Sequence, residues 1–446
     1  MEGKQIVLGE YGVQPLKVNL KEGVMTDAPV APFSFYDPKN FKAKEQKPDV
    51  PLYIPLNTLN APENYSKEKM FSDFEEQKDG NLKLKNKDLK EKQKGVVTTI
   101  FKEAAHKIFE GKGIVGLSLP VRIFEPRSMI ERICDLFNYS SHYLNRAAAT
   151  DEPAERIKYI MGFVLAAAPH GICQYKPFNP LLGETYQATQ ADGTTIECEH
   201  ISHHPPITAY YVNNPNFKIY GTFTINGEIH MNSVDGFYEG WGTVEFKDGS
   251  KYKFCLPNLS IYGLIMGSRG LQYTTCITVF HEASQTKGVL KYAADAKSGL
   301  TSLFSSSRSD VVRGQIYKYD VKKHQHILHK HKDKWLAMLK DLAEINDVAQ
   351  PLHKVEGSWL REIRVDGELL WSLDQDVRFA QQHNYIANPL PSDCRFREDL
   401  IWLFRKNEDL AQLWKVKLEE QQRHERALRK KVNEARSLGD KTPSTK

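Results

Sequence analysis

The sequence predicts an α+β protein, mainly β, whose centre is one large antiparallel sheet curled into a barrel. Between about residues 184 and 319, apolar and polar residues alternate with a period of two, which is typical of strands. Turn dipeptides such as Asn226-Gly227 and Asp248-Gly249 separate the short runs, and helical periodicity occurs only before and after them. A sheet of this length must curl, and a large barrel can enclose an apolar cavity.

The composition fits a folded protein with a large core. The chain has 446 residues, 40% of them hydrophobic, and its net charge of +5 is too small to call for nucleic acid as a partner. The cysteines are scattered and include no CxxC pair, which favours reduced thiols in the cytosol. No apolar run reaches the ~20 residues of a membrane-spanning helix, and no apolar signal region follows Met1. We therefore expect a soluble cytoplasmic monomer that contacts membranes only peripherally.

Residues 1–94 are predicted to be an irregular extension. Eight prolines between positions 15 and 62 interrupt every short apolar run, so no long helix fits there. The lysine-rich stretch from Lys78 to Lys94 is interpreted as a flexible linker or a membrane-facing tether. The folded domain is expected to span residues 95–436, and residues 437–446 are expected to be a disordered tail.

Residues 96–110 have the pattern of an amphipathic helix. Apolar residues recur in pairs every fourth position, and charged residues lie between them. Gly111 and Gly113 follow and could act as a hinge. Two interpretations stay open: a helix packed on the core, or a lid that covers a cavity or dips into a membrane. The apolar face is formed by Val97, Ile100, Phe101, Ala104, Ile108 and Phe109.

The segment from Tyr175 to Glu184 is predicted to be a rigid loop. Its two X-Pro steps favour extended or turned backbone, and Gly183 permits a tight bend. The loop carries a cation, Lys176, and a hydrogen-bonding amide, Asn179. Turn chemistry alone also explains this composition, so a purely structural role stays open.

Two adjacent histidines, His203 and His204, are expected at the end of a strand. The residues before them alternate, and Pro205-Pro206 must end the strand because proline has no N–H for a sheet. Imidazoles at such a position suit an anionic, oxygen-rich group such as phosphate. Zinc bound by His200, His203 and His204 is a rival interpretation, although consecutive strand residues point to opposite faces. Ordinary surface or core histidines are a third.

Two charged segments follow the predicted sheet. Residues 322–334 hold five lysines and four histidines; we interpret them as a solvated basic loop, with contact to an anionic membrane as the alternative. A long charged helix is expected to end near Arg436. In it Lys415, Glu419 and Arg423 recur at i, i+4 and i+8, so they share one stripe, which is either a surface ion-pair ladder or part of a site.

Four segments resemble the oxysterol-binding protein family. Residues 199–206 are similar to its Glu-Gln-Val-Ser-His-His-Pro-Pro fingerprint, with His200 in place of the usual glutamine. Residues 117–132 are similar to its Leu-Pro-Val…Glu-Pro-x-Ser-Met segment, closest to the sterol-handling branch. Residues 175–184 match its Lys-Pro-x-Asn-Pro-x-Leu-Gly-Glu motif at every fixed position, and residues 390–399 look like its Leu-Pro-x-Thr-Asp-x-Arg-x-Arg-x-Asp segment.

The resemblance covers about residues 96–436 and implies both fold and function. The implied fold is an incomplete barrel enclosing a lipid tunnel, with a lid at 96–110 and a C-terminal helical part at 320–436. The implied function is lipid transfer, in which a sterol and phosphatidylinositol 4-phosphate bind in one tunnel and are exchanged between membranes, without metal or cofactor. By the same resemblance, the phosphoinositide head group would lie against Lys176, Asn179, His203, His204, Lys415, Glu419 and Arg423.

Other functions fit parts of the same pattern. The second lipid could be phosphatidylserine instead of a sterol, and a lipid sensor would bind without transporting. A lipid hydrolase using His203 and His204 is a different class, but the sequence has no G-x-S-x-G elbow and no HExxH motif. We therefore predict a binding protein and not an enzyme.

Overall fold

The computed structural model describes residues 18–19, 24–25, 70–93, 95–96, 119–172, 175–295 and 308–439, with side chains up to Glu434. The predicted lid helix at 96–110 lies outside the described residues, apart from Val96, and so do residues 440–446 of the predicted tail. None of the described helices is both long and apolar enough to cross a bilayer.

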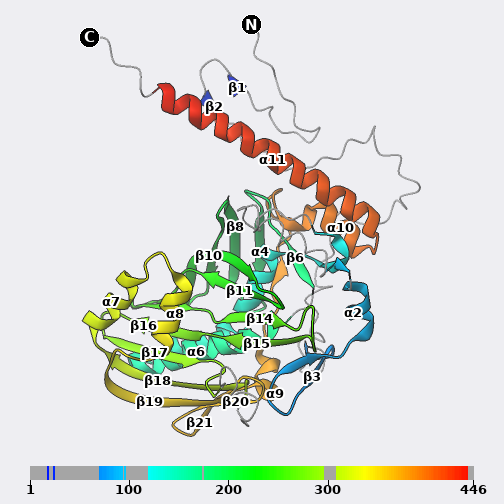
Figure 1. Cartoon of the computed structure of the whole chain (residues 1–446). Helices are drawn as coiled ribbons and strands as arrows, with labels where there is room; N and C mark the ends of the chain where they lie inside the picture. The colour runs from blue at the N-terminus through cyan, green and yellow to red at the C-terminus, as the bar shows by residue number, and fades with distance from the viewer. Residues whose placement is uncertain are drawn as a thin grey trace, which may run out of the picture.

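Most strands belong to one antiparallel sheet (Figure 1). Two short pairs stand outside it: β1 (Val18–Asn19) with β2 (Val24–Met25), and β5 (Phe124–Ser128) with β6 (Lys176–Phe178). The strands of the main sheet are β3 (Phe74–Glu76), β4 (Leu82–Leu84), β7 (Thr185–Thr189), β8 (Thr195–His203), β9 (Pro206–Asn213), β10 (Phe217–Ile229), β11 (Ser233–Glu239), β12 (Gly242–Phe246), β13 (Lys251–Cys255), β14 (Asn258–Tyr262), β15 (Gly270–Thr274), β16 (Cys276–His281), β17 (Thr286–Lys291), β18 (Val311–Tyr319), β19 (Val348–Ser358), β20 (Glu362–Val365), β21 (Glu368–Ser372) and β22 (Asn384–Tyr385).

The main sheet branches at β10, its longest strand. The first half of β10 pairs with β12 and the second half with β11. The β12 branch continues through β13, β16, β17, β18, β19, β20 and β21, and the β11 branch through β14, β15, β4 and β3. The other edge of β10 pairs with β9, followed by β8, β7 and β22. These pairings never lead back to their starting strand, so the sheet is an incomplete barrel, as predicted.

The sheet is longer than the predicted range of 184–319, because β3 and β4 precede it and β19 to β22 follow it. The interpretation of residues 78–94 as a flexible linker is therefore wrong: β4 pairs with β15, and a helix follows at once. Leu82, Leu84 and Leu89 are buried between exposed or half-buried lysines, and the lysines hid this apolar pattern in the sequence.

The helices lie before and after the strands. Short 3₁₀ turns accompany them at η2 (Val121–Ile123), η3 (Cys134–Phe137), η4 (Ala168–Gly171), η6 (Val377–Phe379) and η7 (Cys394–Phe396). The α-helices are α2 (Lys87–Gln93), α4 (Met129–Ile133), α5 (Ser140–Ala148), α6 (Pro153–Ala167), α7 (Val321–Lys330), α8 (Trp335–Ala343), α9 (Leu373–Asp376), α10 (Glu398–Phe404) and α11 (Glu408–Gly439).

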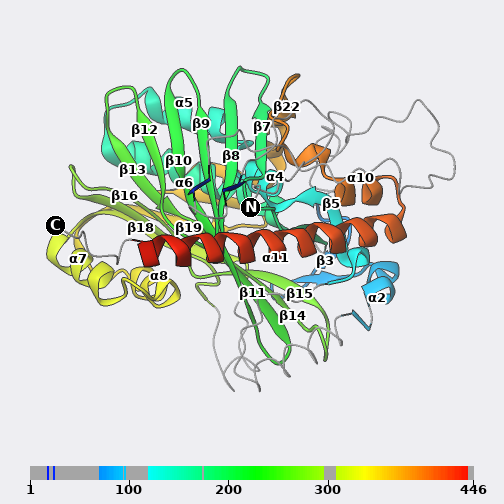
Figure 2. The ribbon, with the colours of Figure 1, turned by 90° about the horizontal axis from the view of Figure 1, so that it is seen from above.

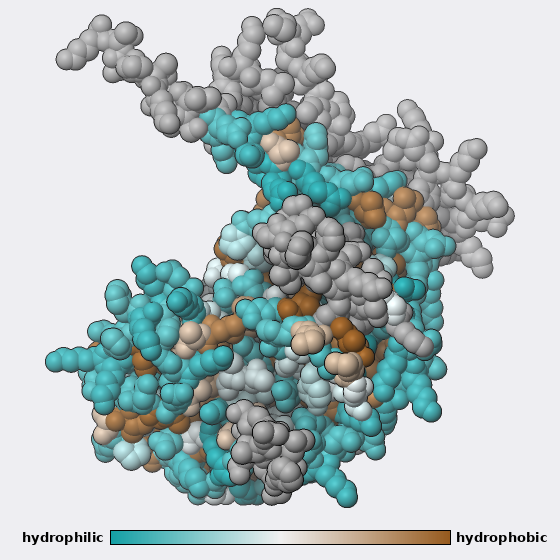
Figure 3. Space-filling model, viewed as in Figure 1, coloured by the Kyte–Doolittle hydropathy of each residue, from teal (hydrophilic) through white to brown (hydrophobic). Residues whose placement is uncertain are grey.

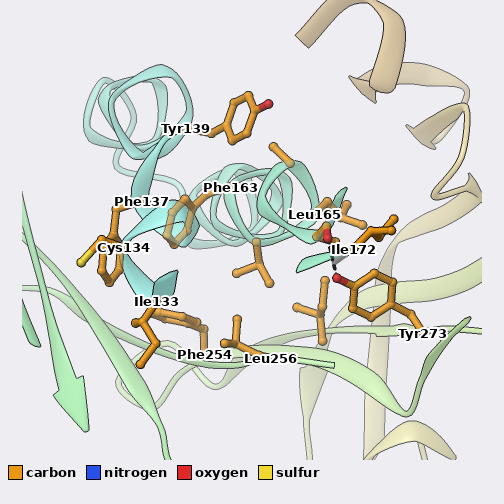
Figure 4. Close-up of a cluster of buried hydrophobic side chains, with 14 of the residues drawn as sticks. Ile133, Cys134, Phe137, Tyr139, Phe163, Leu165, Ile172, Phe254, Leu256 and Tyr273 are labelled. Carbon is orange, nitrogen blue, oxygen red and sulfur yellow. Dashed lines mark hydrogen bonds between the residues drawn. The ribbon is translucent and has the colours of Figure 1, made fainter. Parts of the chain in front are cut away.

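Helix α6 packs closely against β16 and β17. At Gly288 of β17 a Cβ atom would lie 2.6 Å from Ile157 Cγ2 and 2.6 Å from Met161 Sδ, so only glycine lets the helix approach this far. Figure 4 shows Phe163 of α6 and Phe254 of β13 in the resulting core, where Tyr273 donates a hydrogen bond to the Ala168 carbonyl. Side chains of α6 and of the strands it contacts thus fill this part of the barrel.

Helices α7 and α8 cover the opposite face of β16 and β17. Cys276 and Phe280 of β16 join a second buried cluster with Ile327 and Leu339, whereas Ile277, between them in the strand, joins the main core. The interpretation of residues 322–334 as a solvated loop is therefore wrong for α7. Asp320 caps this helix by accepting from Lys322 N (2.9 Å), and the apolar side of the helix was masked by its lysines and histidines.

The strands β11 and β14 and the second half of β10 form a region that we call the half-exposed wall. These strands contact mainly other strands, and most of their residues are neither buried nor fully exposed. By the strand register, the partly buried apolar residues of these strands share one face, and most of them pack against the main core. Figure 3 shows apolar surface around β11 and β14. The partly buried apolar residues are Ile225, Val234, Tyr238, Leu259 and Ile261.

Candidate functional site

Three segments that are distant in the sequence meet at one end of the sheet: β6, the end of β8, and α11. Figures 1 and 2 show α11 lying across the end of the sheet at which β8 stops. Strand β8 ends at His203, as predicted, because the prolines that follow cannot continue its hydrogen-bond ladder. Helix α11 starts after Asn407, whose side chain accepts from Leu410 N (3.0 Å) as an N-cap.

Lys176 and Lys415 share one aromatic ring. The parallel pairing of β5 and β6 places Lys176 beside Phe124, and its Nζ lies 5.0 Å from the centre of that ring; Lys415 Nζ lies 5.5 Å from the same centre. Lys176 donates to Asn179 Oδ1 (2.6 Å) and to the Pro177 carbonyl (3.1 Å). Burial, followed by the charges of Lys415 and Arg397, lowers the pKa of Lys176 to about 8.

The predicted stripe of Lys415, Glu419 and Arg423 forms on α11, but its residues become more exposed to solvent from the first to the last. Lys415 Nζ lies 2.6 Å from Glu419 Oε1, and Arg423 lies 4.0 Å from Glu419 Oε2. The exposed fraction of the side chain rises from 5% at Lys415 through 31% at Glu419 to 55% at Arg423. Lys415 therefore faces the site, and Arg423 faces mainly solvent.

The histidines form a short chain. The buried His200 contacts Thr208 Oγ1 through Nδ1 (3.1 Å) and His203 Nδ1 through Nε2 (3.2 Å), and the ring centres of His203 and His204 are 4.9 Å apart. Burial, then the neighbouring His204 and the arginines, lowers the pKa of His203 to about 4, so it is neutral near pH 7. Both nitrogens of His200 are thus engaged, and no group of three metal-ligating residues exists among the described residues.

Arg397 is a central residue to which sequence reasoning assigned no role. It lies 2.8 Å from Glu184 and 2.7 Å from Asp399, and it donates to the Asn179 carbonyl (2.9 Å). It thereby holds the Lys176 loop in place, and its positive charge lowers the pKa of both Lys176 and His203. The only signal in the sequence was its place in the segment 390–399. We call Lys176, His203, His204, Arg397 and Lys415 the basic cluster.

Arg426 is a second residue that the predicted stripe did not include. Burial and the charge of Arg426 lower the pKa of His204, and Arg426 and Arg429 both contribute to the lowered pKa of His203. The structure thus brings the histidines together with the C-terminal half of α11, beyond Arg423. Apart from Arg423, the residues expected at the head group lie in or directly beside the basic cluster, whereas the predicted lid face from Val97 to Phe109 lies outside the described residues.

Comparison with solved structures identifies the class of fold. The Osh3 ORD of Saccharomyces cerevisiae, solved with PI(4)P, superposes with a TM-score of 0.56 at 20% identity, over 73% of this chain and 83% of that chain. The Osh1 ORD domain in complex with ergosterol gives a TM-score of 0.55 at 19% identity, over 71% of this chain and 77% of that chain. The fold is therefore that of these lipid-binding domains.

Sequence comparison then gives the family. The model of the family described as oxysterol-binding protein matches residues 104–438. The chain is 30% identical over 346 residues to oxysterol-binding protein 9 of Dictyostelium discoideum, covering 75% of this chain and 76% of the relative. It is 27% identical over 332 residues to oxysterol-binding protein-related protein 3B of Arabidopsis thaliana, covering 72% of this chain and 68% of the relative. The chain belongs to the oxysterol-binding protein family.

Proposed function

We propose that this protein carries single lipids between membranes, binding a sterol and phosphatidylinositol 4-phosphate alternately in one site. In this proposal the head-group phosphates lie against Lys176, Asn179, Lys415 and the histidine pair. The apolar part of either lipid lies on the half-exposed wall. Both lipids use the same wall, so binding of one excludes the other.

The observation that carries the proposal is the excess of positive charge around Lys176. No carboxylate lies within ion-pair distance of Lys176 in the part of the chain that the structure describes, and Glu419 is already engaged by Lys415. Burying a cation without a counter-ion is unfavourable, and the lowered pKa of Lys176 reflects this cost. A phosphate group would supply the missing charge through charge-assisted hydrogen bonds.

The half-exposed wall supports the proposed binding of the apolar part of the lipid. Its apolar face contains Tyr238 and Ile261, which are partly buried although they lie in the middle of paired strands. Removing apolar surface from water contributes about 25 cal/mol per Å², so a sterol or an acyl chain placed there would be stabilised and the wall covered. The fold shared with domains that hold ergosterol and PI(4)P agrees with this use.

Transport between two vesicle populations tests the proposal. The wild-type protein should move labelled sterol from donor to acceptor vesicles and labelled phosphatidylinositol 4-phosphate in the opposite direction. Donor vesicles with phosphatidylserine in place of sterol identify the second lipid. A protein that binds but transports neither would be a sensor, and this result would overturn the carrier function.

Two variants test the head-group assignment. Lys176→Ala, and separately His203→Ala with His204→Ala, should abolish transport of phosphatidylinositol 4-phosphate and leave sterol transport intact. Lys218→Ala, an exposed lysine of β10, removes the same charge elsewhere and should behave as the wild type. Unchanged phosphoinositide transport by both site variants would rule out the assignment.

A further inference from the structure

We propose that the loop between β10 and β11 (residues 230–232) and the loop between β14 and β15 (residues 263–269) dock the protein on an anionic membrane by inserting apolar side chains into its head-group region. We call these two loops the apolar tip. The inference rests on the proposed function, because a carrier must meet a membrane to load and release a lipid, and it names the surface that makes this contact.

The apolar tip carries the three most exposed large hydrophobic side chains of the described residues. Met231 is 81% exposed, Met266 63% and Ile265 52%. Single exposed apolar side chains are common on protein surfaces, but these three come from two loops that are held together. A cluster of this kind is expected where the surface meets another apolar phase.

The side chain of Asn232 holds the two loops together. Its Oδ1 accepts from Ile265 N (2.8 Å) and Met266 N (2.9 Å), and its Nδ2 donates to the Met266 carbonyl (2.9 Å). The Asn232 carbonyl accepts from Leu264 N (3.2 Å). The conformation that presents the apolar side chains is thus fixed before any contact, so insertion costs little additional ordering of the chain.

An apolar row of the sheet leads to the apolar tip. By the strand register, Ile229 of β10 lies opposite Val234 of β11, Val234 lies opposite Ile261 of β14, and Ile261 lies opposite Leu271 of β15. Figure 2 shows the ends of β11 and β14 projecting at the lower edge of the sheet. The apolar tip is therefore continuous with the half-exposed wall, and docking there would bring the wall close to the membrane that supplies or receives the lipid.

Lysines beside the apolar tip supply charge that complements an anionic membrane. Strand β4 pairs with β15, and Leu84 N donates to the carbonyl of Arg269 at the end of the tip (2.9 Å), so the residues after Leu84 lie close to the tip. Residues 83–92 contain five lysines and two acidic residues, and Lys85 and Lys87 are exposed. One lysine close to an anionic bilayer strengthens binding about fivefold.

The carboxylates of the β10–β11 hairpin lie on the other face of the sheet. Glu228 and Asp235 are opposite each other in the register, and each alternates with a residue of the apolar row. His230 Nε2 lies 3.2 Å from Asp235 and 3.8 Å from Glu228, and Ser260 donates to Asp235 (2.6 Å). These acidic groups therefore have partners within the protein and do not face the apolar row.

A membrane fits the apolar tip better than a protein partner does. A stable protein interface buries about 800 Å² of each partner and is usually centred on aromatic or arginine side chains. The two loops contain no Phe, Tyr or Trp, and the side chain of Arg269 is engaged by Gln93 (2.5 Å). Shallow insertion into a bilayer surface needs only a few apolar groups beside basic ones.

Vesicle flotation tests the docking surface. Full-length protein is mixed with phosphatidylcholine vesicles, with or without phosphatidylserine and free of sterol and phosphoinositide. Replacing Met231→Ser, Ile265→Ser and Met266→Ser together should lower partitioning onto the phosphatidylserine vesicles at least about tenfold, because less apolar surface leaves water. The exposed leucines Leu369 and Leu390 provide the control, and Leu369→Ser with Leu390→Ser should match the wild type. A triple variant that floats like the wild type would overturn the inference.

The lysines are tested in the same assay. Lys85→Gln with Lys87→Gln should weaken flotation with phosphatidylserine at least about fivefold and leave flotation with phosphatidylcholine alone unchanged. Lys322→Gln with Lys323→Gln removes the same charge from the exposed side of α7 and should match the wild type. An equal loss in both pairs would mean that total charge, and not the apolar tip, governs docking.

Hydrogen exchange locates the contact in the unmodified protein. With phosphatidylserine vesicles, the amides of residues 264–266 should exchange more slowly, whereas those of the turn at residues 247–250 should not change. Protection of the turn without protection of the tip would contradict the inference. So would a triple variant that keeps its vesicle binding but self-associates less than the wild type in sedimentation, since the tip would then join two copies of the chain.

Binding of a water-soluble, short-chain phosphatidylinositol 4-phosphate separates this inference from the proposed function. Calorimetry should give the same affinity for the triple variant and the wild type, because the apolar tip contains no residue of the basic cluster. A wild type that floats with vesicles but does not bind this ligand would overturn the proposed function and leave the docking surface standing. A triple variant that binds the ligand and still floats normally would overturn the docking surface alone.

Discussion

Lys287 and Lys415 are both buried lysines, but their surroundings differ. Lys287 lies 2.7 Å from Asp347 and 3.1 Å from His324 Nδ1, and Tyr317 donates to the other oxygen of Asp347 (2.7 Å). The side chains of Lys287 and Asp347 are 0% and 1% exposed, so the pair is sealed. Each charge there has its counter-charge within the protein.

Lys415 lies in the opposite situation. Its carboxylate partner Glu419 is 31% exposed, and a second ammonium, that of Lys176, lies over the same Phe124 ring. Positive charge exceeds negative charge among these side chains. The balanced pair at Lys287 is therefore expected to stabilise the fold, whereas the unbalanced charge at Lys415 is the position that we propose a ligand anion occupies.

The largest expected effect is a loss of stability when the buried ion pair of Lys287 and Asp347 is broken. Lys287→Met should lower the free energy of unfolding by about 3–5 kcal/mol, because it leaves Asp347 buried without its cation. Urea denaturation followed by tryptophan fluorescence measures the change. Adding Asp347→Asn should recover part of the loss; a single variant as stable as the wild type would contradict the structural role of the pair.

The matched substitution at the site should affect binding and not stability. Lys415→Met should change the free energy of unfolding by less than about 1 kcal/mol, because Glu419 keeps its contact with water and the repulsion from Lys176 disappears. Binding of phosphatidylinositol 4-phosphate should fall at least about tenfold. If Lys415→Met destabilised the fold as much as Lys287→Met, the distinction between the two lysines would fail.

The stability of the free protein and its affinity for the phosphoinositide should depend on pH in opposite directions. The folded protein releases the Lys176 proton near pH 8, whereas the unfolded chain keeps it to near 10.5, so the free energy of unfolding should rise with pH in this window. Anion binding needs the ammonium form, and the affinity for the phosphoinositide should therefore fall as the pH rises through about 8. Calorimetry at several pH values measures this fall; the Lys176→Met protein provides the baseline and should lack that step.

The smallest expected effect is the loss of phosphoinositide affinity on replacing Phe124, whose ring contacts both Lys176 and Lys415. Phe124→Leu removes the aromatic face that lies under two ammonium groups, and a cation–π contact at a partly exposed site contributes about 0.5–1 kcal/mol. Phosphoinositide affinity should therefore fall by a factor of about two to five. Phe178→Leu, a neighbouring buried ring that lies near Arg397 and not near Lys415, serves as the comparison. An equal loss in both variants would argue for general packing.

The sequence predicts the sheet from local signals, whereas most members of the basic cluster were implied by the resemblance to the family. The period of two predicts the strands, and the prolines after His204 place the histidines at a strand end, as observed. Arg397 was missed because Glu184, the partner that ties it to the Lys176 loop, comes beside it only after folding. The lid remains a prediction.

The branching of β10 gives one strand two neighbours on the same edge. At the junction Gly221 pairs with Gly242, and a Cβ at Gly221 would lie 2.9 Å from the Trp241 carbonyl, so the two half-sheets separate without intervening side chains. In the described sheet, residues 225–229 of β10 pair with β11 alone, whereas residues 218–221 pair with β9 on one edge and with β12 on the other. Backbone amides of residues 225–229 should therefore exchange with deuterium sooner than those of residues 218–221, and if a sterol binds as proposed, this branch of the sheet is where we expect the wall to adapt to it.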